Sequence, residues 1–166
     1  MKKLFVSVIT IILTISFSVV SMAGCRGNMD HMGDKPDISV EYLSGEYAAQ
    51  LIRDGAKLIF GVISDISEDS DGMTVLIISE YEFTEDNSMP NGVFIADKNM
   101  ESLYVLSPEA SATFLSGRSS ISKALAADEF IAEAAREIIT AGSTDKFYDI
   151  YIMGDWIELL IARYIP

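Results

Sequence analysis

An acidic run near the middle of the chain is the densest group of possible metal ligands. It contains Asp65, Glu68, Asp69 and Asp71, and it ends at Gly72. Outside the cell, protein modules bind calcium through carboxylate and backbone oxygens at about 10⁻⁴–10⁻³ M. The dipeptide Asp71-Gly72 is also a strong signal for the turn of a β-hairpin. Two interpretations therefore compete here, a calcium site and an acidic turn.

The calcium interpretation fails at its strongest ligand. When Gly72 is aligned with the glycine of a twelve-residue EF-hand loop, Ser67, Asp69 and Asp71 fall at ligand positions. Ile78 then stands where a bidentate glutamate is required. The sequence therefore favours a plain hairpin turn over residues 65–71, and we expect no metal and no cofactor.

Catalysis by an activated nucleophile has few residues available. The chain has one histidine, His31, and one cysteine, Cys25, whereas a catalytic triad needs a base beside its nucleophile. None of the common glycine-rich phosphate or nucleophile-elbow motifs occurs. A pair of carboxylates could still cleave glycosidic bonds, and Glu80 and Glu82 share one face of an expected strand. Because such alternation is typical of a solvated strand face, we assign no catalytic residue.

The first 25 residues have the pattern of a secretory signal. Lys2 and Lys3 precede an uncharged apolar run over 4–20, and small residues follow that run. The segment 22–25, Met-Ala-Gly-Cys, resembles the lipobox of bacterial lipoproteins, with Met22 in place of the commoner leucine. A retained membrane helix is disfavoured, because the run is short and diluted by Ser and Thr. Ordinary signal cleavage that leaves a spare thiol is the remaining alternative.

The lipoprotein resemblance implies a lipid anchor on Cys25. In that family the cysteine is diacylated and becomes the first residue after cleavage, and two acyl chains hold a protein durably on a membrane. The implied organisation is a signal peptide over 1–24 and a lipidated tether over 25–38, which contains His31 and is polar with Gly and Pro. Residues 39–166 are then a single globular domain on the extracytoplasmic face of the cell membrane.

Charge and cysteine content restrict the possible partners. The chain carries 25 acidic and 12 basic residues, a formal charge of −13. Removing residues 1–24 takes away two lysines and makes the charge −15. Because nucleic-acid binders present basic surfaces to phosphate, we expect no nucleic-acid partner. With Cys25 acylated, the domain would contain no cysteine, which suits an extracytoplasmic location.

Apolar periodicity and turn signals predict the elements of the domain. Ser44 as N-cap and Gly55 as a stop predict a helix over 45–54. Period-two patterns predict strands over 58–66 and 73–83, and shorter strand pieces over 93–96 and 102–106 that form one bent strand or a hairpin. The rest of the prediction is a short helix over 108–115, a loop over 116–120, a helix over 122–140, and a terminal hairpin of 146–153 and 156–165 around Gly154-Asp155.

These elements predict an α+β fold. After an N-terminal helix, we expect five to six strands in an antiparallel sheet or a small OB-like barrel, with one or two helices before the C-terminal hairpin. The order of three strands, a helical segment and two strands resembles that of an OB-type barrel. The last strand is apolar on both parities, so it should be covered on both faces.

The leading functional hypothesis is a membrane-anchored lipoprotein that displays a small acidic binding domain and is not an enzyme. Its expected partners are the membrane, through the lipid on Cys25, and a protein or peptide. Scattered aromatic residues such as Tyr148 and Tyr151 are interpreted first as core, and otherwise as part of a partner surface. The alternative is a carboxylate- or metal-dependent hydrolase that acts on cell-envelope glycans. A solute-binding subunit of two lobes would need a longer chain.

Overall fold

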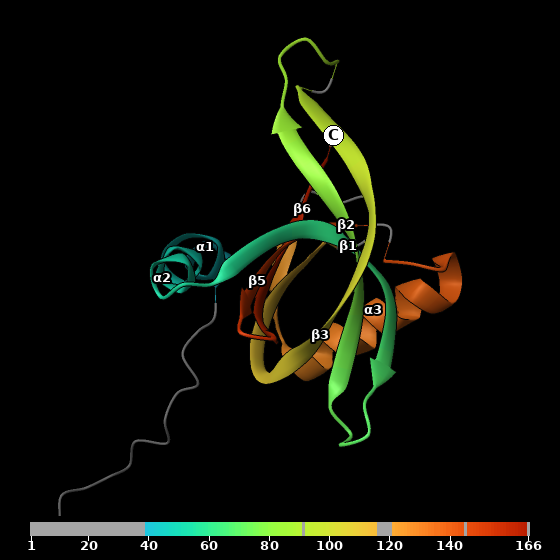
Figure 1. Ribbon diagram of the computed structural model, residues 1–166. Helices are drawn as coiled ribbons and strands as arrows, with labels where there is room; N and C mark the ends of the chain where they lie inside the picture. Colours follow the sequence, from blue (N-terminus) through green and yellow to red (C-terminus); the bar gives the residue numbers. More distant parts are fainter. Residues whose placement is uncertain (1–38, 91, 116–120, 145, 166) are drawn as a thin grey trace, which may run out of the picture. The chain divides into compact units, whose positions relative to one another are not determined.

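The computed structural model describes residues 39–165, apart from 91, 116–120 and 145. This part of the chain is an α+β structure, most of it strand (Figure 1). The helical elements are α1 (Val40–Tyr42), η1 (Leu43–Tyr47), α2 (Ala48–Arg53) and α3 (Ala127–Ala141). The strands are β1 (Lys57–Glu68), β2 (Thr74–Glu85), β3 (Val93–Leu115), β4 (Ser122–Ala126), β5 (Phe147–Met153) and β6 (Trp156–Arg163).

Five of the strands form a closed circuit of backbone pairing. The sheet order is β2-β1-β5-β6-β3-β4, and β2 also pairs with β3. Each neighbouring pair in the circuit is antiparallel except β3 and β6, which are parallel. The expectation of an antiparallel sheet is therefore wrong at this pair, and the sheet is mixed. A closed circuit of five strands requires it, because directions cannot alternate all the way round an odd number.

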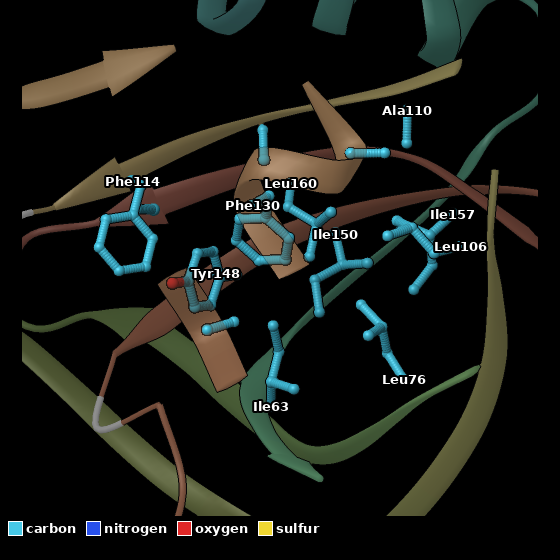
Figure 2. Close-up of a cluster of buried hydrophobic side chains, with 14 of the residues drawn as sticks. Ile63, Leu76, Leu106, Ala110, Phe114, Phe130, Tyr148, Ile150, Ile157 and Leu160 are labelled. Carbon is cyan, nitrogen blue, oxygen red and sulfur yellow. The ribbon is translucent and has the colours of Figure 1, made fainter. Parts of the chain in front are cut away.

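The main core lies inside this circuit and is closed by α3. The helix contributes Phe130 and Ala134, both fully buried, and the other side chains of this core come from every strand. Figure 2 shows Phe130 among core residues of β1, β2, β3, β5 and β6. Gly61 on β1 is required by close packing, because a Cβ there would lie 2.5 Å from the backbone oxygen of Ser79 on β2. A second, smaller core consists of Leu43, Ala48, Leu51 and Leu159, between the N-terminal helical segment and β6.

The N-terminal helical segment begins earlier than its sequence signals predict. Ser39, not Ser44, is the N-cap, and its Oγ accepts a hydrogen bond of 3.1 Å from the backbone N–H of Tyr42. Ser44 lies inside the helix and donates instead to the carbonyl of Val40. The predicted stop is correct, since Gly55 follows α2 with a positive φ of 96°.

Two helical predictions in the second half of the chain are wrong. The segment 108–115, predicted as a short helix after Ser107-Pro108, is the last part of β3, which continues as one bent strand from Val93. Residues 122–126, predicted as the start of the second helix, form β4 and pair with Ser111–Leu115. The helix begins only at Ala127. β3 pairs with β4 over Ser111–Leu115 and with β6 at Ser111 and Ala112, and residues 110–115 are all buried. This pairing and burial outweigh the local capping signal. The predicted loop over 116–120 lies outside the described residues.

The terminal hairpin matches its prediction. Gly154 has a positive φ of 61° and Asp155 does not, as a type II′ turn requires. β6 is covered on both faces, as its two apolar parities indicate, but the faces do not follow simple alternation. Its pairing with β5 shifts register between Ile157 and Leu159, so Ile157 and Leu160 face the main core whereas Leu159 faces the second core.

Candidate functional site

A cleft opens where β1 and β2 diverge. Their pairing ends at Phe60 and Tyr81; before Phe60 β1 pairs only with β5, and beyond Tyr81 β2 pairs only with β3 among the described strands. The free part of the β2–β3 hairpin, Glu82–Ala96, is called the arm below; it projects from the circuit (Figure 1). The cleft has a volume of about 520 Å³ and is lined by Leu58, Ile59, Phe60, Tyr81, Glu82, Phe83, Lys98, Asp149 and Arg163.

Aromatic rings form one wall of this cleft. Phe60 is packed between two rings, with centroid distances of 5.3 Å to Phe83 and 5.0 Å to Phe147. Tyr81 meets Phe147 edge to face at 5.1 Å. Phe60 is buried, but Tyr81 and Phe83 are only half-buried. Because aromatic side chains on a protein surface offer large apolar area at low entropic cost, this wall can bind an apolar side chain.

The positive charges of the cleft are each paired with a carboxylate. The Nε of Arg163 donates to Oδ2 of Asp149 at 2.7 Å, and its guanidinium carbon lies 4.5 Å from the ring centroid of Phe83. Lys98 donates to Oε2 of Glu80 at 3.3 Å. Glu82 is exposed and forms no ion pair with a described cation. The uncompensated charge in the cleft lining is therefore negative.

Glu80 is a buried carboxylate on β2 that is joined to Lys98 of the cleft lining. Burial alone would raise its pKa, but hydrogen bonds from Ser102 and Lys98 outweigh burial and hold the pKa below its ordinary value. The Ser102 hydroxyl donates to Oε1 at 2.7 Å. Nearby, Lys57 donates to the Tyr104 hydroxyl at 2.9 Å, and this bond raises the pKa of the lysine.

The expected solvated face of Glu80 and Glu82 is therefore only half correct. Glu82 is exposed, whereas Glu80 is 4% exposed and its two oxygens are taken by Ser102 and Lys98. General acid catalysis needs a carboxyl with a raised pKa, which is opposite to the direction at Glu80. The partners of Glu80 belong to β3, so the pattern of β2 alone does not reveal them.

The acidic run over 65–71 is divided between a strand and a turn: Asp65 and Glu68 lie in β1, and only Asp69–Met73 form the tight β1–β2 turn. Oδ1 of Asp69 accepts the backbone N–H groups of Asp71 at 2.9 Å and Met73 at 2.8 Å. Gly72 has a φ of 78°, which suits glycine. Among the described residues, no group of three or more His, Cys, Asp or Glu side chains is placed to hold a metal ion.

Calcium should leave the stability of the protein unchanged relative to other salts. Oδ1 of Asp69 is already used by the backbone, and the loop lacks the bidentate twelfth ligand. Melting curves with 10 mM calcium, with magnesium, and with sodium chloride of matched ionic strength should coincide. A rise of about 1.4 kcal/mol confined to calcium, which corresponds to a Kd near 1 mM, would contradict this if the double change Asp69→Asn and Asp71→Asn abolished it.

The aromatic residues considered for a partner surface lie elsewhere. Tyr148 is fully buried beside Phe130 in the main core (Figure 2), and burial raises its pKa. Its hydroxyl has no hydrogen-bond partner among the described residues. Tyr151 is half-buried against the second core. The cleft uses Phe60, Tyr81 and Phe83 instead. The available signal was the repeated aromatic residues at 81 and 83 on the outward parity of β2.

The predicted lipidation site, Cys25, lies outside the described residues, as do the predicted signal peptide over 1–24, the predicted tether over 25–38 and His31. Within the described ranges, no helix is long and apolar enough to cross a membrane. Comparisons of the chain with protein-family models, curated proteins and solved structures found no match. The fold and the cleft thus define the protein as an α+β protein that is mostly strand and has a surface cleft.

Proposed function

We propose that this protein is a lipoprotein, anchored by acyl chains on Cys25 to the extracytoplasmic face of the cell membrane, whose domain binds a protein or peptide. The anchor rests on the basic start, the apolar run and the Met-Ala-Gly-Cys segment. The lipid keeps the domain at the membrane, and the residues between Cys25 and α1 give it reach. The function of the domain is to capture a polypeptide partner in the cell envelope.

The barrel of this domain is of the OB type. Three features support this assignment: a five-strand circuit in the order β1-β2-β3-β6-β5, a parallel pair at β3 and β6, and a helix immediately before the last two strands. Oligonucleotides, which bind to some OB folds, do not suit a domain of this charge.

The cleft between β1 and the arm is the observation that carries the binding role. It combines half-buried aromatic rings with charged side chains that are fixed by one another, and its volume suits one or two side chains of a partner. Preorganised charges and rings lose little entropy on binding. This arrangement favours a binding site for a partner over a set of surface side chains with no binding role.

A photo-crosslinking residue in place of Glu82 should capture a discrete protein partner in the cells that make this protein. The position lines the cleft and is exposed, so the substitution should leave the core intact. The same residue in place of Ile139, which is 85% exposed on α3, is the control and should give no such product. Equal crosslinking at both positions, or a product that persists when Phe83→Ala removes part of the aromatic wall, would argue against the cleft.

Cys25→Ala should abolish lipid attachment and leave the precursor uncut. The thiol is the atom that carries the acyl chain in lipoproteins, and processing of this kind follows acylation. Metabolic labelling with a fatty-acid analogue, read together with precursor size, measures both effects. Ser21→Ala, which keeps a small residue beside the cleavage region, is the matched control and should be labelled normally. Label that remains on the Cys25→Ala protein would refute the anchor.

A further inference from the structure

The divergence of β1 and β2 leaves two strand edges at the cleft that pair with no other described strand. β1 pairs with β5 over Lys57–Ile59, and β2 pairs with β3 over Glu82–Glu85, each on one side only among the described strands. An unpaired edge presents backbone N–H and C=O groups that can pair with another chain. Both edges border the cleft, since Leu58, Ile59, Glu82 and Phe83 all line it.

The charge of the arm selects between possible partners. From residue 82 to residue 96 the sequence contains three acidic residues, Glu82, Glu85 and Asp86, and no basic one. The cations next to the arm, Lys98 and Arg163, are already paired with Glu80 and Asp149. A basic segment is therefore attracted to the edge of β2, whereas the edge of β1 begins with a lysine.

We propose that the cleft binds a basic, extended polypeptide segment, which adds as a strand to the open edge of β2 at Glu82–Glu85. This inference rests on the proposed function and specifies how the partner binds. Main-chain hydrogen bonds to the edge supply affinity, and side-chain pockets on alternating positions supply specificity.

The two faces of β2 determine the sequence pattern of the partner. Tyr81 and Phe83 share one face, and Glu82 and Thr84 share the other, because side chains alternate along a strand. An added strand must follow the same alternation. Its apolar side chains lie over the aromatic wall, and its basic side chains lie beside Glu82. The recognised segment therefore alternates apolar and basic residues over about four to six positions.

Fluorescence anisotropy with labelled eight-residue peptides tests this mode of binding. The protein is the full chain in micelles of a nonionic detergent, and the probe is an end-blocked peptide of alternating lysine and valine. We expect it to bind at least tenfold more tightly than the glutamate–valine peptide. Two further probes are methylated on backbone nitrogens, one at every lysine and the other at every valine. Since alternate N–H groups of a strand point to the same edge, one should bind like the parent and the other at least tenfold more weakly.

The protein variants separate local from general electrostatics. Glu82→Lys with Glu85→Lys should weaken binding of the lysine–valine peptide at least tenfold. Glu41→Lys with Asp54→Lys makes the same change in net charge at exposed positions on the N-terminal helical segment, and should change the Kd less than threefold. Equal weakening by both pairs would overturn the docking position.

The outcomes also separate this inference from the proposed function. If neither peptide binds, the strand-addition inference fails and crosslinking at Glu82 alone decides the proposed function. If binding survives Phe83→Ala in a variant with a normal melting curve, the cleft is not the peptide site and both proposals fail. A different set of results would contradict the strand-addition inference alone. In that set Phe83→Ala abolishes peptide binding, but either both methylated peptides bind like the parent peptide or the glutamate–valine peptide binds more tightly than the lysine–valine peptide.

Discussion

Phe130→Ala is expected to destabilise the protein by about 3–5 kcal/mol, the range for removing a buried phenylalanine. The ring is fully buried where α3 meets the strands, and it packs edge to face against Phe114 at 6.3 Å and Tyr148 at 5.8 Å. Its removal leaves a cavity beside the Tyr148 and Phe114 rings, which lie near Phe130 in the main core (Figure 2). Urea unfolding should show a lower midpoint with an unchanged slope.

Two variants control for effects unrelated to the cavity. Phe130→Leu keeps most of the volume and should cost less than about 1.5 kcal/mol. Ile139→Ala changes an 85% exposed residue of the same helix and should lie within about 0.5 kcal/mol of the unchanged protein. If Phe130→Ala were no more destabilising than Ile139→Ala, α3 would not be packed as the structure has it.

The parts of the fold that the sequence predicts are those set by local patterns. The strands over 58–66 and 73–83 and the terminal hairpin follow from period-two alternation and from Gly154. The prediction of a helix at 108–115 was wrong because Ser107-Pro108 is a local signal, while Ser111–Leu115 pair with β4 and two of these residues, Ser111 and Ala112, also pair with β6. Such pairing joins segments far apart in the chain, and no short window of sequence contains it.

The cleft shows the same limit at the candidate site. Phe60, Tyr81 and Phe83 are visible in the sequence as aromatic residues on strands, but only the divergence of β1 from β2 leaves them beside an open edge. The sequence predicts Glu80 to be one of two exposed acids, but the fold places Lys98 and Ser102 of β3 beside it. A register shift in that hairpin, between Glu80 and Tyr81, accompanies the positive φ of Asn99. Sequence periodicity does not contain this irregularity.

Leu159→Ala should destabilise the protein by about 2–5 kcal/mol, the second large effect expected. Simple alternation places Leu159 with Ile157 and Ile161 on one face of β6. The register shift after Ile157 instead turns Leu159 away from the main core, into a fully buried contact with the N-terminal helical segment. The loss of stability therefore comes from the contact of β6 with Leu43 and Leu51 rather than from the core inside the strand circuit.

A double-mutant cycle distinguishes these two placements of Leu159. If Leu159 packs with Leu43, the effects of Leu159→Ala and Leu43→Ala on the free energy of unfolding should be non-additive by about 0.5–3 kcal/mol. Leu103→Ala, at a position 66% exposed on β3, is the control and should change stability by less than about 0.5 kcal/mol. Additivity with Leu43→Ala, combined with coupling to Ile150→Ala in the main core, would mean that β6 alternates regularly and that the register shift is misplaced. If Leu159→Ala destabilised the protein as little as Leu103→Ala, Leu159 would not be packed in either core.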